Sequence, residues 1–276
     1  MDYKDYSIQE YKNNFIKFYD ESEKKKNDDK RREAQKRSIL ETSLSAMNKY
    51  PNVEPKDIWK VIYIAHVNNF SGINDPDVIN LVISADNSWK KSSGHAFEEM
   101  IKELGNLYLK EHNIEILLQK DLNTLLKANE ISNEVRDISW LKEQVKTSIF
   151  DLYISVIQDE KRYVYGCIQS KTSVRDRVTR DREPSMNAMN AFFVSIALVL
   201  DGEFLKLPKF NHMVNGGSQE FPTNGWHSVY VLTNENIADD RIKIINLDME
   251  TFTNDMVKGS KSWLTQRQWI NSDWKP

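Results

Sequence analysis

The feature that most limits how this chain can fold is a pair of neighbouring stretches, residues 149–157 and 163–171, separated by a polar segment. In the first stretch apolar and polar positions alternate, with Phe150, Leu152, Ile154 and Val156 on even positions and Asp151, Tyr153 and Ser155 on odd ones. A period of two is typical of a β-strand with one buried face. The polar segment 158–162 is typical of a turn, so the pattern predicts an antiparallel hairpin.

The register of this hairpin follows from the position of its turn. A turn centred near residue 160 sets Asp151 opposite Gln169 and diagonal to Lys171 on the same face. Paired or diagonal side chains on one face lie within roughly 5 to 8 Å of each other. The hairpin is therefore predicted to hold a carboxylate and an ammonium group close enough for one metal and one phosphate to bridge them.

The remaining periodicity predicts an α/β fold, with a mixed β-sheet flanked by helices. Apolar residues recur at helical spacing from 97 to 107, which predicts a helix entered at residues 92–94, with Glu98 on the border of its apolar face. The other predicted elements are a polar helical segment at 110–146, a helix at 186–200, and strands at 227–232 and 242–247. Residues 1–90 are polar and helix-rich, which predicts a helical N-terminal subdomain followed by a catalytic domain over 91–276.

Charge is concentrated locally in this chain. The net charge of −3 excludes a general binder of polyanions. Between residues 171 and 183, five basic side chains stand against three acidic ones, and this window is where nucleic-acid contact is expected. The single cysteine, Cys167, excludes an intramolecular disulfide framework and indicates a reducing compartment. With no apolar signal core and no apolar run of about 18 residues, we expect a cytoplasmic protein without membrane contact.

These residues resemble the PD-(D/E)XK nucleases and, within them, the CCGG-family type II restriction endonucleases. Asp151 matches the aspartate of the Pro-Asp element, with Phe150 in place of proline, and Lys171 matches the catalytic lysine. Gln169 stands where the common pattern has an acid, but the CCGG branch displaces that acid to a glutamate about a dozen residues beyond the lysine, which is Glu183 here. An Arg-(Asp/Glu)-Arg element and a Gly-x-x-x-Glu element have their counterparts in Arg175-Asp176-Arg177 and Gly94-His-Ala-Phe-Glu98.

The resemblance implies a function for each matched residue. Asp151 and Glu183 are expected to hold Mg²⁺, Lys171 to act beside the attacked phosphate, and Glu98, or its neighbour Glu99, to supply a further acid. Three residues are expected to recognise bases in the major groove. Arg175 and Arg177 would donate hydrogen bonds to guanine, and Asp176 would accept one from cytosine.

The implied substrate is double-stranded DNA with a palindromic CCGG core, cut after the first cytosine on each strand. Likeness to one member of the branch further implies A or T on either side of the core. A palindrome calls for a homodimer or a higher homo-oligomer.

The residues alone leave alternatives open. Arg175, Asp176 and Arg177 are also compatible with a surface ion network, Asp151 with an exposed strand position, and Glu183 with a helix N-terminal acid before Pro184. Gln169 and Phe150 leave open a nuclease-fold protein that binds DNA without cutting it. The long polar N-terminal part leaves open a helical interaction protein.

Overall fold

The computed structural model of the chain describes residues 1–172, 178–200, 203–233 and 237–276. The chain divides into two compact units, Met1–Lys90 and Lys91–Pro276. In the described part of the chain, none of the helices combines the length and apolar composition needed to cross a membrane.

The first unit is helical. Its helices are α1 (Tyr3–Asp20), α2 (Asn27–Lys49), α3 (Pro55–Ser71) and the beginning of α4 (Pro76–Leu109). Helix α3 begins with proline, whose fixed φ suits a first helical turn, and ends at Gly72 in the left-handed conformation. Apolar residues from three helices form the core, namely Tyr11, Ala46, Ile58, Ile62 and Ala65. The break between α2 and α3 falls where the apolar spacing of the sequence is interrupted.

The second unit contains a mixed sheet whose strands follow the order of the chain. The strands are β1 (Ile114–Leu118), β2 (Leu152–Gln158), β3 (Lys161–Lys171), β4 (Val194–Val199), β5 (Ser228–Leu232) and β6 (Ile242–Ile245). The pairs β1–β2 and β2–β3 are antiparallel, and the later pairs are parallel.

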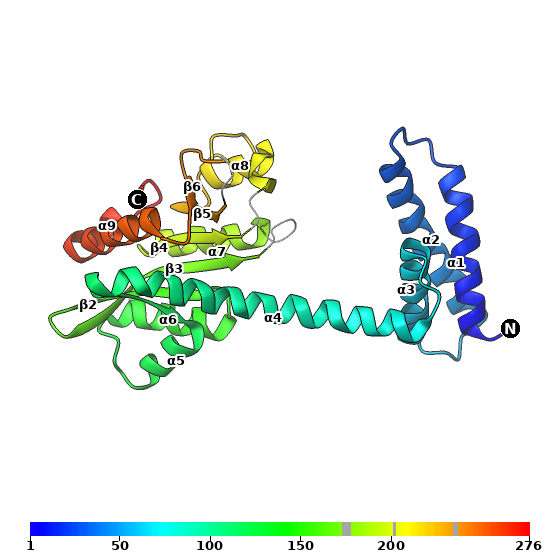
Figure 1. Ribbon diagram of the computed structural model, residues 1–276, viewed down its shortest axis with the longest axis horizontal. Coiled ribbons are helices and arrows are strands. Elements are labelled where there is room, and N and C mark those ends of the chain that lie inside the picture. The colour runs from blue at the N-terminus through cyan, green and yellow to red at the C-terminus, as the bar shows by residue number, and fades with distance from the viewer. Residues whose placement is uncertain (173–177, 201–202, 234–236) are drawn as a thin grey trace. The chain divides into compact units, whose positions relative to one another are not determined.

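Helices lie on both sides of this sheet (Figure 1). They are the end of α4, α5 (Gln119–Lys127), α6 (Val135–Thr147), α7 (Val178–Asn190), α8 (Pro208–Asn215) and α9 (Glu250–Gln266), with short 3-10 helices at Lys110–His112, Glu203–Lys206 and Arg267–Trp269. One core joins α4 and α9 to the sheet, and a second joins α5 and α6 to its other face. The predicted mixed sheet flanked by helices is confirmed.

The hairpin has the predicted register at the end next to Asp151 and Lys171. Leu152 pairs with Ile168 and Ile154 with Gly166, and the register shifts by one residue only beyond Ile154. The alternation is interrupted at Asp151, where the chain bends before entering β2. Phe150 therefore packs with Tyr153, in the core shared with α5 and α6, and not on the Leu152 face as predicted.

Three predicted elements are wrong. The helix predicted at 186–200 ends at Asn190, and the following apolar run forms β4, a strand buried on both faces. Such strands lack a period of two, so periodicity does not separate them from buried helix. The polar segment 110–146 contains β1, and the helix predicted to enter at 92–94 begins at Pro76.

His227, directly before β5, links three parts of the second unit. Its Nδ1 accepts from the backbone N–H of Ser195 at 3.0 Å, and its Nε2 donates to the carbonyl of Asn271 at 2.8 Å. The ring is fully buried against the edge of Trp274. Burial, with a smaller contribution from the charge of Arg241, lowers the pKa of His227 to about 4, although the hydrogen bond to Asn271 opposes the shift.

We expect His227 to make stability fall in mild acid. Between its unfolded pKa of 6.5 and its folded pKa of about 4, the unfolded chain binds a proton that the folded protein excludes. The free energy of unfolding should therefore fall as pH drops below 6.5, by at most about 1.4 kcal/mol per pH unit from this residue. Urea denaturation at pH 7 and pH 5 measures this change in the free energy of unfolding.

Two variants test whether His227 is the cause. His227→Asn keeps an acceptor for Ser195 and should make the free energy of unfolding depend less on pH, whereas the surface variant His112→Asn should leave the pH dependence unchanged. An equal pH dependence in His227→Asn and wild type would refute the assignment.

Candidate active site

Asp151 and Lys171 meet at the end of the hairpin. Lys171 is the last residue of β3, and Asp151 is held one residue before β2 by a hydrogen bond from its N–H to the carbonyl of Ile168, 3.1 Å. The Asp151 carboxylate accepts from the backbone N–H of Ser170 at 2.7 Å and lies 3.4 Å from Lys171 Nζ. Two backbone groups of β3 thus hold Asp151 in place, and the last residue of the same strand brings the ammonium group to its carboxylate.

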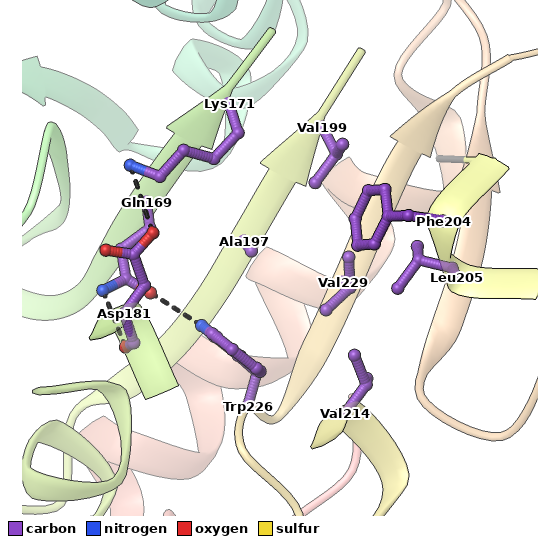
Figure 2. Close-up of a pocket in the computed structure, with 10 residues that line it drawn as sticks. All are labelled: Gln169, Lys171, Asp181, Ala197, Val199, Phe204, Leu205, Val214, Trp226 and Val229. Carbon is purple, nitrogen blue, oxygen red and sulfur yellow. Dashed lines mark hydrogen bonds and ion pairs between the residues drawn. The ribbon is translucent and has the colours of Figure 1, made fainter. Parts of the chain in front are cut away.

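A second carboxylate contacts the same lysine. Asp181, in the first part of α7, places Oδ2 3.4 Å from Lys171 Nζ, and both side chains are about one-fifth exposed. Figure 2 shows Asp181 beside the end of the strand that carries Lys171. Among the described residues, one ammonium group thus lies between two carboxylates, whose oxygens are the kind of ligand that a hard divalent cation takes.

Gln169 lies on the same strand but is enclosed. Its side chain is only 1% exposed. In the common pattern, the acid at this position would be open to solvent. Its Oε1 accepts from Trp226 Nε1 at 2.7 Å, and its Nε2 donates to the Asp181 carbonyl at 3.0 Å. With both ends of its amide engaged, Gln169 does not supply a metal ligand.

Glu98 approaches the cluster from α4. Burial raises the pKa of Glu98, and the negative charge of Asp151 raises it further, while the neighbouring His95, 3.4 Å away, opposes the shift. Glu99 instead pairs with Lys120 of α5 at 2.9 Å. Of these two predicted candidates for the additional acid, Glu98 is the one on the side of Asp151.

The other predicted residues are not brought to the cluster by the described structure. Glu183 is exposed on α7, and within the described residues it makes no ion pair with Lys171. Arg175, Asp176 and Arg177 lie outside the described residues. Sequence reasoning missed Asp181 as a site residue, although Arg180-Asp181-Arg182 repeats the Arg-Asp-Arg pattern five residues after its first occurrence.

The second Arg-Asp-Arg has a structural partner set. Arg182 donates from Nη2 to the Thr223 carbonyl at 2.6 Å and from Nε to the Met213 carbonyl at 3.3 Å. Its guanidinium lies 5.3 Å from the ring centroid of Phe221. Arg182 therefore fastens α7 to α8 and the following loop.

The donor atoms of the cluster suit a hard divalent cation. Carboxylate oxygens of Asp151 and Asp181 share one ammonium partner, and Glu98 is electrostatically coupled to Asp151. Among the described residues, no three His, Cys, Asp or Glu side chains form a complete metal cage. Mg²⁺ does not need one, since it usually keeps several waters and takes one or two carboxylates with phosphate oxygens.

Comparison with known proteins identifies a family and two solved structures that this chain resembles. Residues 129–269 match the family model described as BsaWI restriction endonuclease type 2. A crystal structure of a pre-specific restriction endonuclease BsaWI–DNA complex is 53% identical, with a TM-score of 0.84 over 100% of this chain and 98% of that chain. A specific restriction endonuclease AgeI–DNA complex is 18% identical, with a TM-score of 0.41 over 92% of this chain and 91% of that one. No curated protein sequence matched.

Proposed function

Because this chain belongs to the BsaWI family of type II restriction endonucleases, we propose that it cleaves double-stranded DNA at a palindromic site with a CCGG core. The observation that carries the chemistry is the convergence of Asp151, Lys171 and Asp181 at the end of β3. Carboxylates flanking one ammonium group provide both a cation site and a positive charge for a phosphate. The DNA complex of the BsaWI relative supports DNA as the substrate.

Asp151 is proposed as the first metal-holding acid, and α7 as the source of the second. Glu183 is the acid that the family resemblance implies, whereas Asp181 is the acid that contacts Lys171, so the geometry favours Asp181. When bound, Mg²⁺ lowers the pKa of a coordinated water and offsets charge on the phosphate. Lys171 donates to the phosphate or to the attacking water as negative charge builds up. Glu98 is proposed as the additional acid, in a place where burial and the charge of Asp151 raise its pKa.

Base recognition is proposed for Arg175, Asp176 and Arg177. Forked guanidinium groups match O6 and N7 of guanine, and a carboxylate accepts from N4 of cytosine. Two guanines and one cytosine per half-site agree with a CCGG core, and the A or T flanks come from the likeness to one relative. The palindrome supports a homodimer or a higher homo-oligomer. The lone buried Cys167 agrees with a cytoplasmic enzyme.

Cleavage of paired duplexes tests the function. We expect a duplex with a CCGG core flanked by A or T to be cut in Mg²⁺, and a duplex with a scrambled core or an EDTA-treated sample to remain intact. A denaturing gel maps the staggered cut on each strand against the bond expected after the first cytosine.

The outcomes separate the functions left open by the sequence. Specific binding without cutting in Mg²⁺ would favour a DNA-binding protein that has lost cleavage. Equal cutting of both duplexes would overturn the proposed core.

A further inference from the structure

Gln169 connects two segments that the active site needs. It stands two residues before Lys171 on β3, and its amide reaches Trp226 on one side and the Asp181 backbone on the other. The contact with Trp226 spans 57 positions of the chain, and the contact with Asp181 spans 12. The amide therefore joins the strand, the start of α7 and the segment before β5 at one point.

The direction of this amide is fixed by its partners. Trp226 offers only a donor, so it selects Oε1 of Gln169 and leaves Nε2 to face the Asp181 carbonyl. Trp226 is itself buried, and with Gln169, Lys171 and Asp181 it lines a pocket whose other lining residues are apolar, namely Ala197, Val199, Phe204, Leu205, Val214 and Val229 (Figure 2). Because Trp226 is only 2% exposed and Gln169 only 1%, their hydrogen bond is shielded from water and strengthened.

The Asp181 backbone is thereby held where its side chain reaches Lys171. Gln169 holds the carbonyl of Asp181. The next residue, Arg182, is anchored by its hydrogen bonds to the carbonyls of Met213 and Thr223. Gly225 permits the second anchor, since a Cβ there would lie 2.5 Å from the Met213 carbonyl oxygen and 2.9 Å from Arg182 Cγ. With the backbone held in this way, Asp181 Oδ2 lies 3.4 Å from Lys171 Nζ.

We propose that Gln169, oriented by Trp226, is a positioning residue that sets the Asp181 carboxylate against Lys171. Gln169 occupies the position that an acid has in the common pattern, and it acts by holding the backbone of a different acid, Asp181. The proposal rests on the proposed role of Asp181 as the second acid. Residues that orient metal-holding groups typically change metal affinity or activity by about 10- to 100-fold when they are replaced.

The first test replaces Gln169 with methionine, which matches its length and removes both polar atoms. We expect Gln169→Met to lower single-turnover cleavage by about 10- to 100-fold and to raise the Mg²⁺ concentration that gives half-maximal rate. DNA binding in Ca²⁺ should stay close to wild type. The matched control is Gln158→Met, an exposed glutamine on the same hairpin. Trp226→Phe removes the indole donor while keeping an aromatic ring, and it should shift the same metal dependence if Gln169→Met does not fold.

A double-mutant cycle decides whether Gln169 acts through Asp181. Adding Gln169→Met to Asp181→Asn should cause little further loss, whereas its effect should multiply with that of Glu183→Gln. Full multiplication with Asp181→Asn, or an unchanged Mg²⁺ dependence in the folded Gln169→Met protein, would overturn the proposal. Cleavage is scored at whichever site the wild-type enzyme cuts, so an error in the proposed CCGG core leaves this test valid.

Discussion

Replacing Lys171 with alanine is expected to slow DNA cleavage by about 10²- to 10³-fold, the loss typical of removing one group that stabilises transition-state charge. The ammonium group lies 3.4 Å from both Asp151 and Asp181, so the variant loses the only positive group described within this cluster. The two carboxylates remain, and they should still accept a divalent cation. Single-turnover cleavage in saturating Mg²⁺ measures the effect on the chemical step.

Binding separates this effect from misfolding. Lys171→Ala should retain specific DNA binding in Ca²⁺ within about tenfold, because base contacts and not this lysine set specificity. Lys120→Ala removes an exposed lysine paired with Glu99 and serves as the control, with cleavage expected near wild type. Cleavage by Lys171→Ala within a few-fold of wild type would remove the lysine from the proposed chemistry.

The hairpin could be predicted because its pattern is local. Alternation along β2 and the polar turn at 158–162 set the pairing that carries Asp151 to Lys171, and the observed register agrees beside the site. The two strands missed, β1 and β4, are buried on both faces or nearly so. A strand of this kind has a short, continuous run of apolar residues, and periodicity does not distinguish such a run from a buried helix.

The second acid shows where sequence reasoning stops. Asp181 and Glu183 are two residues apart, and the family resemblance implied Glu183. Which of them faces the lysine depends on where the Asp181 backbone is held, and the residue that holds it, Gln169, is oriented by Trp226. A hydrogen bond between residues 57 positions apart leaves no periodic trace in the chain. The choice of acid is therefore a property of tertiary packing.

Arg267 is expected to be the most important single charged group for the stability of the nuclease unit. Its guanidinium makes two hydrogen bonds to Asp137, of 2.6 and 2.8 Å, and the Asp137 side chain is only 2% exposed. Arg267→Ala leaves that buried carboxylate with only the exposed Arg136, 3.5 Å away, as a described ion-pair partner, and breaking a buried ion pair in this way typically costs about 3 to 5 kcal/mol. Urea denaturation followed by tryptophan fluorescence measures the change.

Two comparisons test whether the buried charge that has lost Arg267 is the cause. Glu134, which also contacts Arg267 at 3.3 Å, is 73% exposed, so Glu134→Gln should cost less than about 1 kcal/mol. Replacing both members of the buried pair, as Asp137→Leu with Arg267→Met, should cost less than Arg267→Ala, because no charge is then left in the interior. If the double replacement is the more damaging of the two, then packing around Arg267, and not its charge, holds the 3-10 helix after α9 against α6.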